Sequence, residues 1–201
     1  MEWFIDKDDF KIMKKEIEGF DLKREMIISK SREILKSSKY AIYAVHKGEL
    51  AEAKKLLNQA EKVISALKKE IENTPRLQNT GAFSAAAQEY AEARCFYGFA
   101  KDKKIPSVDE MGILVEDYLL GLCDLTGELG RRAVMSVIKN DIDEVYMIRD
   151  AVEGIFGMFL ELNLRNSELR KKSDQIKWNL KKIEDIIYDI KTRGIKNGKS
   201  R

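Results

Sequence analysis

Two glutamates stand three residues apart in the least polar part of a highly charged chain. The stretch AAAQEYAEARCF, residues 85–96, holds Glu89 and Glu92 among alanines and aromatic residues. Charged residues make up 35% of the chain, yet the window 81–100 carries only those two acids and Arg94. A spacing of three places both carboxylates on one face of a helix. We therefore treat Glu89 and Glu92 as a candidate functional pair.

A second group of acids lies in the leucine-rich stretch EDYLLGLCDLTGELGRR, residues 116–132. Asp117, Asp124 and Glu128 follow at spacings of seven and four, which keeps them on one stripe of a helix. Acids in apolar surroundings are costly unless they are paired, protonated or bound to a metal. The bases near them in the sequence are three arginines: Arg94, Arg131 and Arg132.

If the two segments face each other, up to five carboxylates converge with too few basic partners. A hard divalent cation would resolve this, because Mg²⁺ accepts carboxylates together with water and phosphate oxygens. Histidine-based metal sites and a Ser-His or Cys-His nucleophile would need the single histidine, His46, which is far from both segments in sequence and is expected to pack at a helix end. What remains is Mg²⁺ or Mn²⁺ chemistry on phosphates, in which the metal generates hydroxide and stabilises charge on phosphoryl oxygens. The alternative is that each acid pairs with an arginine or faces solvent.

Three glycines also interrupt the second acidic stretch: Gly121, Gly127 and Gly130. A glycine inside a helix costs about 1 kcal/mol relative to alanine. These positions therefore indicate that another backbone or a ligand approaches this helix closely.

The elements that must position these acids are helices. Apolar residues recur at helical spacing nearly throughout, no convincing alternation of strand type is present, and only 2 prolines occur. The chain is predicted to be all-α, an antiparallel bundle of about seven helices in one domain over residues 1–195, with a flexible basic tail at 196–201. A capped helix start is expected at Ser107 with Glu110. The expected helices cover residues 8–18, 21–47, 49–72, 82–101, 114–139, 141–162 and 166–193.

The last of these helices carries an apolar seam with spacings of four, three, four and three. Such a seam packs against another helix, either of the same chain or of a neighbouring subunit. From residue 165 to the end, twelve basic and five acidic residues give either a solvated face or a surface that attracts phosphate. The residues of the seam are Ile176, Leu180, Ile183, Ile187 and Ile190.

Localisation is expected to be cytoplasmic. No apolar run approaches about 18 residues, the length typical of a membrane span. The acidic first twenty residues do not resemble a secretory signal. Cys95 and Cys123 lack metal-type spacing and are expected to be buried thiols, which fits a reducing compartment.

The segment DYLLGLCDLTGEL at 117–129 resembles the DYLLGxxDLTGEL signature of the translin family. QEYAEA at 88–93 is similar to the QEYVEA segment of that family's translin-associated factor X (Trax) branch. The stretch at 164–194 resembles the C-terminal helix of translin itself. The resemblance covers most of residues 20–195, with one departure at Gly130, where the family usually has Met after GEL.

This resemblance implies seven-helix subunits that assemble into hollow octamers and bind single-stranded RNA or DNA. Trax subunits carry a Mg²⁺-dependent endoribonuclease site, whereas translin subunits lack its acids. Carried over residue by residue, the Trax catalytic acids fall on Glu89, Glu92 and Asp124, which would hold the metal, with Glu128 as a fourth. A translin-like tail with a Trax-like site is what a self-sufficient homo-oligomer of prokaryotic or archaeal type would require.

Binding of RNA needs basic groups for the phosphates and aromatic rings for the bases. One side of the first long helix supplies both, unless that side is only a solvated amphipathic face. Arg94 and Arg131, next to the acids in sequence, are expected to touch phosphate or orient a carboxylate. The residues of the long helix are Arg32, Lys36, Lys39, Tyr40, Tyr43 and Lys47.

These observations leave three alternative hypotheses for the function of this chain. The first is a Mg²⁺- or Mn²⁺-dependent endoribonuclease that cleaves single-stranded RNA inside a homo-oligomeric shell. The second is a non-catalytic assembly that binds single-stranded nucleic acid, against which the retained acids argue. The third is an all-α nucleotide pyrophosphohydrolase, which also uses Glu-x-x-Glu beside an acidic helix but with a different acidic spacing on that second helix.

Overall fold

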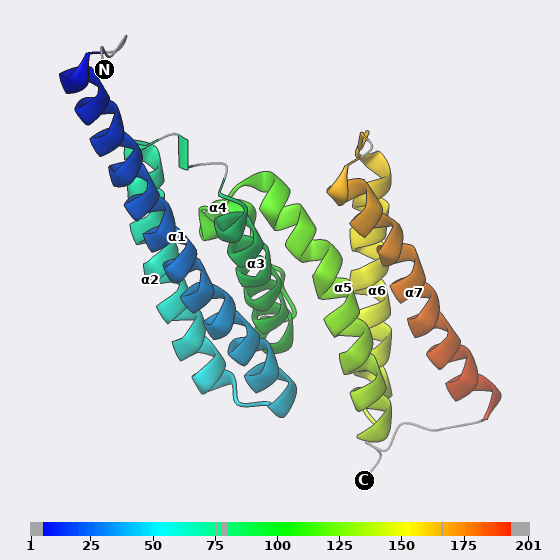
Figure 1. Ribbon diagram of the computed structural model, residues 1–201. Coiled ribbons are helices and arrows are strands. Elements are labelled where there is room, and N and C mark those ends of the chain that lie inside the picture. Colours follow the sequence, from blue (N-terminus) through cyan, green and yellow to red (C-terminus); the bar gives the residue numbers. More distant parts are fainter. Residues whose placement is uncertain (1–5, 75, 78–79, 166, 194–201) are drawn as a thin grey trace.

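The computed structural model of the protein describes residues 6–74, 76–77, 80–165 and 167–193. Within these residues the backbone forms seven α-helices and no strand, which confirms the predicted all-α bundle (Figure 1). The helices are α1 (Lys7–Lys47), α2 (Leu50–Asn73), α3 (Gly81–Asp102), α4 (Val108–Met111), α5 (Val115–Ile138), α6 (Ile142–Glu161) and α7 (Glu168–Thr192). The basic tail expected at residues 196–201 lies outside the described residues.

The first helix is longer than the sequence analysis predicted. We expected a short helix to end near Gly19 and a second one to follow, but α1 continues through that glycine without a break. A single glycine in an exposed helix costs only about 1 kcal/mol, and the strong helix formers on both sides outweigh it. The helix ends instead at Gly48, whose φ of 81° is the left-handed conformation that glycine adopts readily.

Side chains fix the starts of several helices, largely as predicted. Asp6 accepts a hydrogen bond from the backbone N–H of Asp8 at 2.7 Å and caps α1. Ser107 and Glu110 form the expected capping box at α4. Ser167 accepts from a backbone N–H in the first turn of α7. These caps satisfy N–H groups that have no partner within their own helix.

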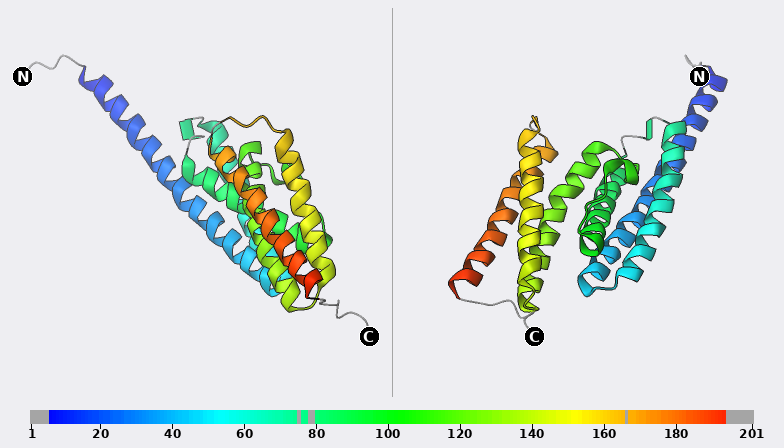
Figure 2. Two further views of the ribbon diagram at one scale, coloured as in Figure 1. Left: turned by 90° about the vertical axis from the view of Figure 1, so that its right-hand side faces the viewer. Right: turned by 180° about the vertical axis from the view of Figure 1, so that it is seen from behind.

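The helices pack in a sequence that makes α3 and α5 the middle of the molecule. Helix α1 packs against α2 and α3, α3 packs against α5, and α5 packs against α6 and α7. Figure 1 shows α1 and α2 at one side, α6 and α7 at the other, and α3 and α5 between them. The N-terminal part of α1 extends past the rest of the bundle (Figure 2). The two acidic segments therefore lie on adjacent, central helices.

The close contact of α3 with α5 depends on one glycine. A Cβ added at Gly121 would lie 2.6 Å from the Cβ of Ala91 and 2.8 Å from the carbonyl oxygen of Gln88. The expectation of a close approach is thus confirmed at Gly121. No backbone approaches closely at the other two glycines: a Cβ at Gly130 would meet nothing within 4 Å, and at Gly127 the nearest atom is 3.8 Å away.

This difference predicts opposite effects for two alanine substitutions in the same helix. Gly121→Ala is expected to lower the free energy of unfolding by about 1–3 kcal/mol, because α3 must move away from α5. Gly130→Ala is expected to raise it by up to about 1 kcal/mol, because alanine favours the helix and no atom obstructs it. Urea unfolding of the two variants measures both values. Equal effects would show that the α3–α5 contact is not limited by Gly121.

The apolar seam of α7 packs within the chain. Ile176 and Ile183 are fully buried, and Leu180 and Ile190 are nearly so. Because α7 packs against α5 and α6, the seam closes this side of the core. No helix in the described part of the chain is long and apolar enough to cross a membrane.

Candidate active site

Four carboxylates from α3 and α5 meet between the central helices. Burial raises the pKa of Glu89, and the nearby charges of Asp124 and Glu128 raise it further. The charges of the same two acids also raise the pKa of Glu92. The structure therefore brings together the four acids that the sequence analysis assigned to the site. We call Glu89, Glu92, Asp124 and Glu128 the acid cluster.

Glu92 is the most deeply buried member of the acid cluster, with only 8% of its surface exposed. Burial is the largest cause that raises its pKa to about 8, followed by the negative charges of Glu89 and Asp124. The carboxyl group of Glu92 makes no hydrogen bond or ion pair with the described part of the chain. At neutral pH this carboxyl group therefore keeps its proton unless a cation enters the cluster.

A lysine from the last helix enters the acid cluster. Nζ of Lys172 donates to Oδ2 of Asp124 at 2.5 Å, and its charge lowers the pKa of Glu89 and of Glu92. Lys172 was not among the predicted site residues, because it lies 48 residues from Asp124 in the sequence. Its position in the sequence could have indicated a buried contact, however. Lys172 precedes Ile176 by four residues and so lies one turn before the buried seam of α7, on the same face.

The single histidine also belongs to this site. The Nε2 atom of His46 donates a hydrogen bond to Oε2 of Glu128, and its ring lies 4.7 Å from that of Phe96. This hydrogen bond is the main cause that lowers the pKa of Glu128. His46 packs in the last turn of α1, as expected, but its distance from the acids in sequence misled us about its distance in space. It joins α1 to the acid cluster because α1 packs along α3.

Two exposed cations lie at the border of the acid cluster. Nζ of Lys39 is 3.9 Å from Oε2 of Glu89, and Nη1 of Arg131 is 3.8 Å from Oε2 of Glu128. Both side chains are 60% exposed, so they can reach a ligand in solvent. The two other predicted RNA-binding residues of α1, Arg32 and Lys36, are exposed earlier in the helix.

Arg94 does not lie beside the acid cluster, contrary to our expectation. Its positive charge instead acts to lower the pKa values of Tyr90, Cys95 and Glu110. The reason is helical geometry: at 100° per residue, Arg94 projects well over a quarter-turn away from Glu89. We therefore leave Arg94 out of the proposed site.

Asp117 also stands apart from the other acids of its helix. It accepts hydrogen bonds from Ser84 at 2.5 Å and from Gln88 at 3.4 Å. The spacing of seven to Asp124 does put both on one stripe, but it also separates them by two turns, about 10 Å along the axis. Asp117 is 3% exposed and its Oδ2 atom has no partner. It joins the N-terminal half of α3 to α5 rather than the acid cluster.

The acid cluster has the right donor atoms for a hard cation but not a finished geometry. In the described part of the chain, no group of three or more His, Cys, Asp or Glu side chains is arranged to hold a metal ion. Two members have other partners, since Asp124 binds Lys172 and Glu128 binds His46. Carboxylate oxygens are the ligands that Mg²⁺ prefers. The residues therefore fit the ion once side chains turn toward it.

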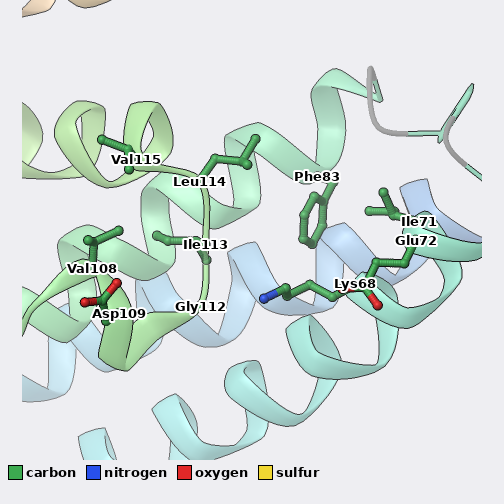
Figure 3. Close-up of a pocket in the computed structure, with 10 residues that line it drawn as sticks. All are labelled: Lys68, Ile71, Glu72, Phe83, Val108, Asp109, Gly112, Ile113, Leu114 and Val115. Carbon is green, nitrogen blue, oxygen red and sulfur yellow. The ribbon is translucent and has the colours of Figure 1, made fainter.

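A pocket elsewhere in the molecule has a different character (Figure 3). It measures about 400 Å³ and lies between α2, the start of α3 and the loop around α4. Its walls are mostly apolar, with Phe83, Ile113 and Leu114 among them, and no member of the acid cluster lines it. The acid cluster therefore fits chemistry on phosphates better than this apolar pocket does.

Comparison with known proteins identifies the family of this chain. The model of the Translin family matches residues 22–194. Translin-associated protein X of Pongo abelii is 26% identical over 226 aligned positions, which cover 92% of this chain and 78% of that protein. Translin of Gallus gallus is 41% identical over 81 residues, but this match spans 40% of this chain and only 35% of that protein.

Solved structures show the same fold. Apo-NeC3PO superposes with a TM-score of 0.85 at 25% identity, over 93% of this chain and 98% of that one. AfC3PO, in a complex with duplex RNA, superposes with a TM-score of 0.83 at 22% identity, over 92% of this chain and 97% of that one. With the family model covering most of its length, the chain belongs to the Translin family.

Proposed function

We propose that the protein is a metal-dependent endoribonuclease that cleaves single-stranded RNA. The observation that carries this proposal is the convergence of four carboxylates between α3 and α5, with the pKa of Glu92 raised to about 8. Groups with strongly shifted pKa values cluster at functional sites. An unpaired, buried acid lowers stability, and a catalytic cation gives a reason for keeping it.

Within this proposal, Glu89, Glu92 and Asp124 hold Mg²⁺, for which Mn²⁺ can substitute. When bound, such a cation makes water a better nucleophile and stabilises negative charge on phosphoryl oxygens. Glu128 supplies a fourth carboxylate, which His46 keeps ionised through its hydrogen bond. Lys39 and Arg131 lie at the border, where they can bind the phosphates on either side of the scissile bond.

Two comparisons support RNA as the substrate. Trax-type relatives match over 92% of this chain, and AfC3PO has been solved with duplex RNA. The local 41% identity to translin favours the second candidate, an assembly that binds single-stranded nucleic acid without cleaving it. The acid cluster favours cleavage, because binding of phosphates alone is opposed by four carboxylates.

The proposed enzyme works as a homo-oligomer, an octamer that encloses the acid clusters. Apolar side chains exposed on one face of the protruding part of α1 are Phe10, Met13 and Ile17, which follow at spacings of three and four and are 46–61% exposed. Contiguous exposed apolar surface of this kind marks protein interfaces. We place the protein in the cytoplasm, where its two buried free cysteines, Cys95 and Cys123, stay reduced.

The direct experiment incubates the purified protein with a 5′-labelled single-stranded RNA. We expect cleavage with Mg²⁺ or Mn²⁺, none in EDTA, and products that end in a 3′-hydroxyl. Attack by the ribose 2′-hydroxyl would leave a cyclic phosphate instead and usually needs a pair of histidines, whereas the chain has one. Binding without cleavage would favour the non-catalytic assembly.

Light scattering on the same preparation checks the assembly. The chain mass of 23.2 kDa makes an octamer easy to distinguish from a monomer. A monomer that cleaves RNA at full rate would show that the shell is not needed.

A further inference from the structure

One exposed face of α1 carries two tyrosines, each paired with a lysine. Lys36, Tyr40, Tyr43 and Lys47 follow at spacings of four, three and four, so they form a single stripe along the helix. Tyr40 is 53% exposed and Tyr43 is 55% exposed. We call these four residues the tyrosine stripe. A single exposed ring is common on a protein surface, but two large rings exposed one turn apart form a patch of the kind that marks a binding site.

The lysines of the stripe accompany its rings. Nζ of Lys36 lies 5.9 Å from the ring centroid of Tyr40, and Nζ of Lys47 lies 5.1 Å from that of Tyr43. At a rise of about 1.5 Å per residue, the two tyrosines lie about 4.5 Å apart along the axis. The stripe therefore offers two successive aromatic rings with a positive charge beside each of them.

The tyrosine stripe runs beside the acid cluster. Lys39 and His46, seven residues apart, form the neighbouring edge of the same helix, and both reach acids of the cluster. Tyr43 lies between them in sequence. Around the helix axis, its side chain projects less than a quarter of a turn from the side chains of Lys39 and His46. A ligand that follows the stripe thus passes along the border of the acid cluster.

We propose that the tyrosine stripe is a stacking platform for unpaired bases, which guides single-stranded nucleic acid past the acid cluster. Unpaired bases stack on aromatic rings while lysines hold the adjacent phosphates, a combination that needs no particular sequence. Bases in a duplex are already stacked on each other and cannot use the rings. This inference rests on the proposed function, in that it names how the substrate of that site is held.

The test measures binding of a fluorescent 20-nucleotide oligo(U) in EDTA, so that no cleavage is required. Tyr40→Ala with Tyr43→Ala is expected to weaken binding at least about 10-fold, because each ring that is removed takes away a stacking contact with a base. Tyr40→Phe with Tyr43→Phe keeps the rings and is expected to bind as the wild type does. Binding of a 20-base-pair RNA duplex should change less than twofold in either variant.

Tyr188 provides a matched control. It is 68% exposed on α7 and projects nearly opposite to Lys172, away from the acid cluster. Tyr188→Ala should leave oligo(U) binding unchanged. Equal losses in this control, or a loss in the phenylalanine variant, would overturn the stacking platform.

Two further readouts separate this inference from its alternatives. If the double alanine variant changes the mass by light scattering, the stripe is a subunit contact and the platform is overturned. If the variant binds and cleaves RNA normally, the platform fails while the proposed function stands. If the wild type binds through its tyrosines but never cleaves RNA with Mg²⁺ or Mn²⁺, the proposed function fails and the platform stands.

Discussion

Glu92→Gln is expected to reduce RNA cleavage by at least about 100-fold and at the same time to raise the melting temperature. The loss of activity follows because the variant lacks a carboxylate that the proposed cation needs. The gain in stability follows because Glu92 is 8% exposed, so that above its ordinary pKa the folded protein must either keep this group protonated or bury its charge, and both cost free energy. Glutamine has a similar size and carries no charge, so the packing between α3 and α5 is retained.

The pH dependence of this gain has a definite sign. The pKa of Glu92 rises from 4.5 to about 8 on folding, so the folded protein binds more protons than the unfolded chain between these values. Stability therefore falls as pH rises from about 4.5 to about 8. Glu92→Gln removes this fall, and the gain is on the order of a few kcal/mol at pH 8, which corresponds to several degrees in melting temperature. Thermal unfolding in EDTA from pH 5 to 9 measures it.

Glu144 supplies the matched control, because it is a part-buried glutamate whose pKa is lowered rather than raised. Although burial raises its pKa, hydrogen bonds from Lys103, Arg132 and Ser136 hold it at about 2. Its ionised form stabilises the protein above pH 4.5, so Glu144→Gln is expected to lower the melting temperature at neutral pH. If Glu92→Gln lowered the melting temperature as well, or cleaved RNA at a normal rate, our account of the acid cluster would be wrong.

Lys172→Met is expected to tighten the binding of Mn²⁺ by at least about 10-fold and to destabilise the metal-free protein. In the structure this ammonium group holds Asp124 at 2.5 Å, so an incoming cation must displace it. Methionine keeps much of the side-chain length and apolar contact but removes the competing charge. Two unit charges a few ångströms apart interact by several kcal/mol near a protein surface, which makes a 10-fold change a conservative expectation.

Calorimetric titration with Mn²⁺, without RNA, measures this affinity directly. Lys172→Arg keeps the charge and should bind Mn²⁺ about as the wild type does. Lys177→Met changes an exposed lysine on another side of α7 and should have no effect. An unchanged Mn²⁺ affinity in Lys172→Met would mean that the cation does not enter the cluster next to Asp124.

The sequence predicted the helices and the four acids, because both depend on patterns that are local. Helical periodicity identifies the buried face of a segment, and acids on that face are conspicuous among alanines and leucines. Periodicity does not show which turns of two packed helices lie next to each other. Asp117 was therefore grouped with Asp124 and Glu128, although it lies two turns away and binds Ser84.

The partners of the acids could not be found in this way. His46 and Lys172 come from α1 and α7, and their contacts depend on how those helices cross the central pair. Arg94 shows the converse error, because nearness in sequence placed it with acids from which helical geometry separates it. The packing of the seam on α7 was also open, since an apolar stripe looks the same whether its partner belongs to one chain or two.

The contacts of the acid cluster have a consequence for how the protein is made. Helices α1, α3, α5 and α7 each contribute to it, and the lysine that pairs with Asp124 comes from the last of them. A chain still on the ribosome, with α7 not yet synthesised, holds Asp124 among the other acids without this lysine. Such an intermediate leaves Asp124 without its ion-pair partner, so docking of α7 completes the subunit and its candidate active site in the same step. The proposed nuclease activity then requires a finished chain.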